Sequence, residues 1–403
     1  MKVLVLAGGS DQIDLINEIK SRGHEVVLVD YYANPPAKRY ADKHIQESTL
    51  DVEKVKEIAL SERVDMVCTA CTDQALLTVA KVSEELGLST YISYKTALNV
   101  TNKSYMKKVM MDNGIPTARY TIVDKVDLSA AKGFRYPLVV KPVDCNSSKG
   151  VKRVEETDDF AGALAEAIEC SRTKTAVIEE FKSGEEVSAD FYIQGDEVKF
   201  LCATQSKKIK NTNSFTITQS YYPVIDENQE KKLVEIAGKI AKAFDLNDTP
   251  LLVQLILHED EFFVLEFSAR MGGGSKHKLI ETITGVDIMK IYVDRIFGAK
   301  PEVHPKKMVK YATMNYVYCH NGLFVKIEGR EEVRNKGLIV KDFQYKMENN
   351  LITKHETSGD RVMGYLVVAD TLDEMAKKIA EVDKTLKIID DKGNDIMIHN
   401  IND

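Results

Sequence analysis

The chain has 403 residues and a net charge of −7, and 44% of its residues are hydrophobic and 29% charged. This length leaves room for two to four domains, and the composition is that of an ordinary soluble globular protein. The negative charge argues against a large nucleic-acid footprint, and no apolar run approaches the length that spans a membrane. Since the N-terminus also lacks the pattern of a targeting segment, we expect a cytoplasmic protein with no nucleic-acid and no membrane partner.

The N-terminal part alternates apolar runs with amphipathic stretches. The runs predict strands over residues 2 to 6, 26 to 29 and 64 to 69, and helical spacing predicts helices over residues 12 to 22 and 73 to 86. Strands that alternate with helices indicate βαβ units and a parallel sheet. We therefore expect residues 1 to 100 to form a small, doubly wound α/β domain.

Two short motifs in this part have structural explanations. Gly8 and Gly9 precede Asp30 as in a dinucleotide site, but the third glycine of G-x-G-x-x-G is missing, which favours a plain turn and makes a dehydrogenase the least favoured function. Cys68 and Cys71 form a C-x-x-C without a second pair nearby. The favoured interpretation is a pair of buried thiols rather than a redox or metal site.

The next stretch predicts a strand that ends in a lysine and runs into a loop of small residues. Thr101 is the expected cap of a helix over residues 103 to 112, and further helices are expected over residues 159 to 170 and 229 to 244. The run PLVVKP predicts a buried strand whose Lys141 must meet an anion or reach solvent. The following DCNSSKGV has small side chains that let backbone N–H groups approach an oxyanion, although a surface loop is the alternative.

A hairpin over residues 251 to 270 carries the strongest chemical signal. Strand alternation places Val264, Glu266, Ser268 and Arg270 on one face, and a register centred on Asp260 sets Gln254 opposite Glu266. Buried unpaired polar groups cost about 1 to 3 kcal/mol each, so these side chains need partners or a ligand. A structural Glu266–Arg270 ion pair is the alternative, but the three glycines that follow favour an anionic ligand.

The C-terminal part reads as a separate unit. Short strand patterns follow residue 300, Asn321-Gly322 is typical of a hairpin turn, and Thr371 with Glu374 predicts a capping box. We expect residues 301 to 403 to form an antiparallel α+β lid domain.

Taken together, these motifs resemble the ATP-grasp superfamily, in the branch that contains carbamoyl phosphate synthase large subunits and carboxylate-amine ligases. The resemblance rests on Lys103 before GIPT, on LVVKP with SSKGV, on VIEEFKSGEE and on VLEFSARMGGG. It implies an ATP-grasp fold over residues 101 to 300, in which two subdomains clasp ATP. The N-terminal domain precedes this fold and the lid follows it. The resemblance also implies a homodimer.

The resemblance assigns roles to individual residues. Catalytic roles go to Arg270 and Lys141, and the groups that bind ATP are Lys103, Lys141, Ser147, Ser148, Gly150, Glu179, Glu180, Phe181, Glu186 and Lys207, with Lys208 as the alternative to Lys207. The ligands of Mg²⁺ or Mn²⁺ are Gln254, Glu266 and Ser268, and substrate contacts go to Gly272, Gly273, Gly274 and Arg361. Ser275 and His277 could also touch substrate.

Two of these positions depart from the family pattern. The family usually has a carboxylate at Gln254 and an asparagine at Ser268, so one unit of negative charge is lost and the second metal ion is in doubt. The expected activity is that of an ATP-dependent carboxylate-amine ligase that acts on small metabolites such as amino acids. The alternatives are a carboxylase that activates bicarbonate and a nucleotide-binding protein with weakened catalysis.

Overall fold

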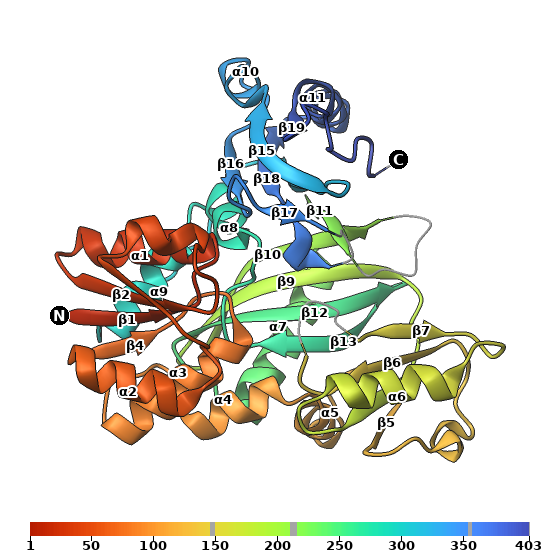
Figure 1. Ribbon diagram of the computed structural model, residues 1–403. Coiled ribbons are helices and arrows are strands. Elements are labelled where there is room, and N and C mark those ends of the chain that lie inside the picture. Colours follow the sequence, from red (N-terminus) through yellow and green to blue (C-terminus); the bar gives the residue numbers. More distant parts are fainter. Residues whose placement is uncertain (146–149, 210–215, 354–356, 403) are drawn as a thin grey trace.

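The computed structural model describes residues 1–145, 150–209, 216–353 and 357–402. Its N-terminal sheet has the strand order β3-β2-β1-β4 with parallel neighbours (Figure 1). The strands are β1 (Lys2–Leu6), β2 (Glu25–Asp30), β3 (Lys43–Gln46) and β4 (Met66–Cys68), and the helices are α1 (Asp11–Ser21), α2 (Val52–Glu62) and α3 (Asp73–Leu86), with a 3₁₀ turn over Pro36–Tyr40.

Alternation along β1 explains why helices cover both faces of this sheet. Val3 and Val5 pack in one core with α1, whereas Leu4 and Leu6 pack in another with α2 and α3. The doubly wound arrangement that the sequence predicts is therefore confirmed. Asp30 accepts a hydrogen bond from the Gly8 amide at 2.6 Å, which gives this pair a structural role.

Two helices connect this domain to the next. α4 (Tyr94–Thr101) leads directly into α5 (Lys103–Asp112), and the side chain of Asn102 accepts hydrogen bonds from the Ser104 and Tyr105 amides. The predicted cap at Thr101 is thus wrong, because Thr101 is the last residue of α4. Asn caps a helix at least as well as Thr, so both residues satisfied the sequence pattern.

A small antiparallel sheet follows, with the order β5-β8-β6-β7. Its strands are β5 (Tyr120–Val123), β6 (Leu138–Pro142), β7 (Lys152–Val154) and β8 (Ala176–Glu180), with a 3₁₀ turn over Leu128–Ala131. Helix α6 (Phe160–Cys170) packs on one face through Leu164 and Ala167 against Leu138, Val140 and Ile178. Lys141 and Glu179 alternate to the other face.

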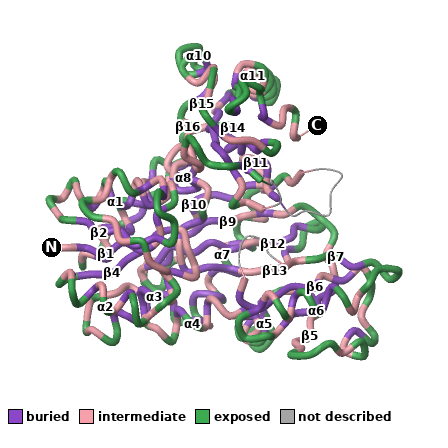
Figure 2. Tube along the Cα trace, viewed as in Figure 1, coloured by how far each residue is buried: buried purple, intermediate pink, exposed green. Residues whose placement is uncertain are grey.

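The central sheet has the order β13-β12-β9-β10-β11-β14-β18-β16 and spans the middle of the molecule (Figure 1). Its strands are β9 (Glu185–Gln194), β10 (Glu197–Lys208), β11 (Ile217–Tyr222), β12 (Thr249–His258), β13 (Glu261–Ser268), β14 (Tyr311–Val317), β16 (Lys341–Gln344) and β18 (Met363–Ala369). Helices α7 (Glu227–Phe244), α8 (Lys276–Thr284) and α9 (Ile288–Ile296) pack against it. Figure 2 shows its strands largely buried, whereas α10 and α11 carry many exposed residues.

The C-terminal segment contributes to two sheets. β14, β18 and β16 extend the central sheet, while β15 (Gly322–Glu328), β17 (Leu351–Ile352) and β19 (Lys387–Asp390) form a small one, with α10 (Arg330–Asn335), a 3₁₀ turn over Ser358–Asp360 and α11 (Leu372–Thr385) nearby. The predicted hairpin at Asn321-Gly322 is wrong, because β14 pairs with β11 and β18, and β15 with β17 and β19. The predicted cap at Thr371 is present, with its side chain accepting from the Glu374 amide at 3.2 Å.

None of the helices in the described ranges combines the length and apolar character that crossing a bilayer requires. The division into domains at residues 100 and 300 stays a prediction, as does the homodimer.

Candidate active site

Three charged side chains are buried together between α5 and the small sheet. Lys107 lies 2.6 Å from Glu179, and Lys141 contacts the other oxygen of the same carboxylate. All three side chains are buried: that of Lys107 is 1% exposed, that of Lys141 9% and that of Glu179 3%. Lys107 also donates a hydrogen bond to the Thr117 hydroxyl. This hydroxyl in turn donates to the carbonyl of Val264 at 2.8 Å. The triad therefore links α5, the small sheet and β13.

The shared carboxylate stays ionised in this environment. Burial alone would raise the pKa of Glu179, but the charges of Lys107 and Lys141 overcome it and lower that pKa to about 2. Burial lowers the pKa of Lys107 to about 8, against the pull of Glu179. Because the folded pKa of Glu179 is lowered, its contribution to stability is present above about 4.5, its ordinary value, and is lost as the pH falls towards 2.

Replacing Glu179 with glutamine is expected to lower the free energy of unfolding by about 3 to 5 kcal/mol, because two buried ammonium groups would lose their counter-ion. Urea denaturation at neutral pH measures this loss. Glu180→Gln is the matched control on the next residue, since its partners Arg119 and Arg135 are exposed and lie 3.7 and 3.5 Å away; we expect about 1 kcal/mol or less. Equal losses in the two variants would show that the triad is not a buried unit.

A second ion pair lies where the hairpin faces α5. Lys103, the first residue of α5, is 3.0 Å from Glu266 and donates to the Cys145 carbonyl at 2.9 Å. Burial would raise the pKa of Glu266, but Lys103 and then Lys141 lower it, so the carboxylate is ionised and both lysines act on it. Lys103 and Lys141 therefore gather at one carboxylate, although they are distant in sequence.

The strand register places Gln254 opposite Glu266, as predicted, but the position of the turn differs from the predicted one. The turn is centred between Glu259 and Asp260, and a bulge at Leu265 shifts the register by one residue. Val264 consequently packs in the core with Phe267, so its predicted place on the face of Glu266 is wrong. The bulge is what keeps the apolar and polar faces separate over the whole strand.

Arg270 is held by a carboxylate from the N-terminal domain. Its Nε lies 2.7 Å from Asp73 Oδ1, a second nitrogen contacts Oδ2, and a third donates to the carbonyl of Met271 at 2.7 Å. Burial would raise the pKa of Asp73, but Arg270 and the Ser268 hydroxyl lower it. The alternative Glu266–Arg270 ion pair is not the one that forms, since Glu266 pairs with Lys103 and Arg270 with Asp73.

The residues around Glu266 fit one hard cation. Glu266 and Gln254 offer a carboxylate and an amide oxygen on adjacent strands, which are ligand types that Mg²⁺ accepts. The hydroxyl of Ser268, the third predicted ligand, helps to lower the pKa of Asp73.

A cavity of about 270 Å³ opens beside Arg270 and the three glycines. Lys276 and Arg361 bring two more cations to its wall, and Ser188, Ser206, Ser220, Gln254, Tyr316, Cys71, Ile217, Leu252, Ser358 and Gly359 complete it. Arg361 stacks 3.5 Å from the centre of the Tyr316 ring and donates to the Tyr318 hydroxyl at 3.2 Å. A Cβ at Gly274, whose φ is +70°, would lie 2.3 Å from an Arg361 nitrogen, so only glycine lets Arg361 reach this wall.

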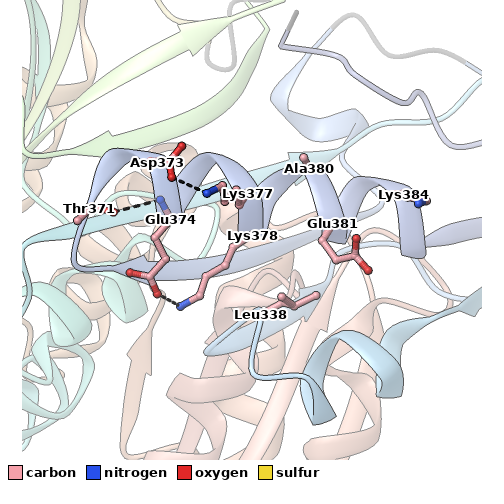
Figure 3. Close-up of a pocket in the computed structure, with 9 residues that line it drawn as sticks. All are labelled: Leu338, Thr371, Asp373, Glu374, Lys377, Lys378, Ala380, Glu381 and Lys384. Atoms are coloured by element: carbon pink, nitrogen blue, oxygen red, sulfur yellow. Dashed lines mark hydrogen bonds and ion pairs between the residues drawn. The ribbon is translucent and has the colours of Figure 1, made fainter.

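A further hollow, of about 670 Å³, lies on α11 (Figure 3). Its acidic and basic side chains pair along the helix, Asp373 with Lys377 at 2.7 Å and Glu374 with Lys378 at 2.8 Å. Such i,i+4 pairs are typical of a solvated helix face. The smaller cavity, with its three cations and bare glycine backbone, is the better candidate site.

Comparison with known proteins agrees with this geometry. Residues 101–275 match the family model described as the phosphoribosylglycinamide synthetase ATP-grasp (A) domain, which covers α5, the small sheet, the hairpin and the glycines. The match identifies residues 101–275 as an ATP-grasp domain. The predicted superfamily and fold are therefore confirmed.

Several relatives match this chain over most of their length. A phosphoribosylamine–glycine ligase from Thermococcus kodakarensis is 26% identical over 94% of this chain and 92% of its own. An L-amino acid ligase from Bacillus licheniformis has a TM-score of 0.80 at 22% identity, covering 96% and 98% of the two chains. A 2-oxoglutarate carboxylase biotin carboxylase domain from Hydrogenobacter thermophilus, solved with MgADP and bicarbonate, has a TM-score of 0.78 at 17% identity, covering 99% and 92%.

The remaining positions predicted to bind ATP lie on several elements. Glu186 on β9 forms an ion pair with Lys208, whereas Lys207 lies over the Tyr221 ring at 5.3 Å. The Phe181 amide donates to the Pro137 carbonyl at 2.9 Å, and Gly150 has a φ of +72°. Ser147 and Ser148 lie outside the described residues. Their predicted roles in binding ATP stay predictions.

Sequence reasoning missed several charged groups of the candidate site. Lys107 could have been found, because it lies one helical turn after Lys103 and so shares its face of α5. Asp73 follows the carboxyl end of β4, where ligand sites of doubly wound domains lie. Lys276 on α8 and Asp190 on β9 form a buried pair 3.4 Å apart. No sequence pattern indicates this pair, because the two residues are 86 positions apart in the chain.

Proposed function

We propose that this ATP-dependent ligase joins the carboxylate of a small metabolite, an amino acid, to an amine through an acyl phosphate. The observation that carries the proposal is the cavity of about 270 Å³ whose wall holds Arg270, Lys276 and Arg361. Three cations beside bare glycine backbone suit a small anion. The volume lies below the roughly 300 to 1,000 Å³ of pockets for drug-sized ligands, which favours a small substrate.

The proposed chemistry needs positioning and charge neutralisation more than a nucleophile. Lys103 and Lys141 would hold the phosphates of ATP, and Arg270 would steady the phosphoryl group as it passes to the substrate carboxylate. Glu266 and Gln254 would hold Mg²⁺, which would neutralise charge on the phosphates. The amine would then attack the acyl phosphate and release phosphate.

Two features favour an amino acid as the acid substrate. The hydroxyls of Ser188, Ser206 and Ser220 line the same cavity as the cations, so an α-amino group as well as a carboxylate would find hydrogen-bond partners. The names of the relatives point the same way, since one is a ligase of glycine and another a ligase of L-amino acids. The amide of Gly274 donates to Asp11 at 3.0 Å, so of the predicted contacts Arg361 and the other two glycines are the better candidates to hold the carboxylate.

The experiment is phosphate release from Mg-ATP with amino acids supplied singly and in pairs with amines. We expect release that depends on one particular pair, with an equal amount of amide product by mass spectrometry. Release that requires bicarbonate instead would support a carboxylase. Nucleotide binding without release under any condition would support a protein that has lost turnover, and either result would contradict the proposal.

A further inference from the structure

Three potential ligand atoms meet beside the glycine loop, and none of them belongs to a predicted Mg²⁺ ligand. They belong to Asp11 at the start of α1, Cys71 after β4 and His277 in α8, and lie within 4.8 Å of one another. His277 is more than 200 residues from the other two, so the cluster exists only because α8 lies against the N-terminal domain.

The imidazole of His277 presents an unpaired lone pair to this cluster. Its Nε2 lies 2.6 Å from Asp14, which as an ionised carboxylate can only accept, so Nε2 carries the proton. The side chain is only 2% exposed, and among the described residues Nδ1 has no hydrogen-bond partner. The nearest carboxylate oxygen, of Asp11, lies 3.9 Å away and is also an acceptor. A buried nitrogen lone pair that faces a carboxylate oxygen is unfavourable without a cation between them.

Asp11 is fixed in place by the loop that follows the hairpin. Its two oxygens accept from the amides of Gly274 at 3.0 Å and Ser275 at 2.7 Å. A carboxylate has about four lone-pair positions, so it keeps the capacity for a further bond. The cluster is thereby attached to the backbone that borders the candidate substrate cavity.

Cys71 completes the cluster and faces the cavity. It adopts a left-handed backbone with φ of 60° and lines the cavity with Gly273. Burial, and then Asp11, raise the pKa of its thiol, which disfavours a role as a reactive thiolate. A bound metal ion would displace that proton.

We propose that Asp11, Cys71 and His277 bind a transition-metal ion of the zinc class. Thiolate and imidazole select such ions over Mg²⁺, and a carboxylate behind the histidine, here Asp14, is the usual outer partner of a metal-binding imidazole. Metal–ligand bonds of about 2.0 to 2.3 Å place tetrahedral ligands roughly 3.5 Å apart. The 3.9 Å between His277 and Asp11 needs only a small contraction, and no two ligand atoms of the cluster are more than 4.8 Å apart. Three protein ligands leave a fourth position, which lies next to the cavity.

The test uses Co²⁺ as an optical probe on the full-length protein freed of metal by chelation. A thiolate bound to Co²⁺ gives a charge-transfer absorption, and we expect it to saturate at one equivalent and to persist in excess Mg²⁺. Cys71→Ser should abolish this absorption, because the variant replaces the sulfur that binds Co²⁺ by oxygen and changes nothing else. Cys68→Ser is the matched control, since Cys68 belongs to the same C-x-x-C and lies outside the cluster.

A measurement on the unaltered chain guards against misfolding of the variant. Zn²⁺ should slow alkylation of Cys71, followed by mass spectrometry, at least tenfold, whereas Mg²⁺ should leave the rate unchanged. The proposal is overturned if Co²⁺ produces no thiolate absorption, if Cys71→Ser retains it, or if Zn²⁺ leaves Cys71 as reactive as before.

Discussion

Replacing Glu266 with glutamine is expected to reduce ATP-dependent phosphate release by about 1,000-fold. Glu266 is the only carboxylate among the three predicted ligands of Mg²⁺, because Gln254 and Ser268 are neutral. A catalytic cation contributes several kcal/mol to transition-state stabilisation, and about 4 kcal/mol corresponds to about 1,000-fold in rate. The change is isosteric, so the strand pairing with Gln254 should remain. The rate constant at saturating Mg-ATP measures the effect.

The matched control for this variant is Glu261→Gln, an exposed carboxylate on the same strand. It should leave the rate unchanged. A Glu266→Gln enzyme that turns over within about threefold of the parent would remove Glu266 from the metal site.

Replacing Arg270 with alanine is expected to lower the same rate by about 1,000-fold, because an arginine that stabilises a transferred phosphoryl group contributes about 10³ to 10⁵. Burial would lower the pKa of Arg270, but Asp73 raises it, so the guanidinium is charged at any working pH. The loss should appear in the turnover number, while the Michaelis constant for ATP changes little, because the contact is made during transfer.

Asp73→Asn separates the charge of Arg270 from its orientation. The variant keeps the guanidinium but replaces a bidentate ion pair by weaker hydrogen bonds, so we expect a loss of about tenfold, between the parent and Arg270→Ala. If Arg270→Ala retained full turnover, the phosphoryl group would have to be neutralised by other residues, and the role given to Arg270 would be wrong.

The fold was largely predictable because its signals are local. The alternation of β1 and the helical spacing of α1 and α3 depend only on which faces are buried, and all three elements occur as expected. Pairing was harder. Gln254 does face Glu266, but only through a bulge at Leu265 that strand alternation does not reveal. Asn321-Gly322 does not form a hairpin turn, because the preceding strand β14 pairs with β11 and β18 of the central sheet.

The site could be predicted in part. Lys103, Lys141, Glu266 and Arg270 were predicted because motif and chemistry coincide in short stretches, and in the structure the first two both act on Glu266. Their partners were not found, because they come from distant elements. Asp73 lies 197 residues from Arg270, and Asp11 lies 263 residues from Gly274. Such contacts are set by how the N-terminal domain packs on the hairpin, which one sequence alone does not specify.

The most direct measurement of the central claim is a crystal structure with Mg²⁺ and a non-hydrolysable ATP analogue. The account predicts that the phosphates contact Lys103 and Lys141, that the ion binds Glu266, and that the terminal phosphate points towards Arg270. Phosphates bound at the Gly8-Gly9 turn or on any other surface, with these four side chains paired as they are now, would contradict it.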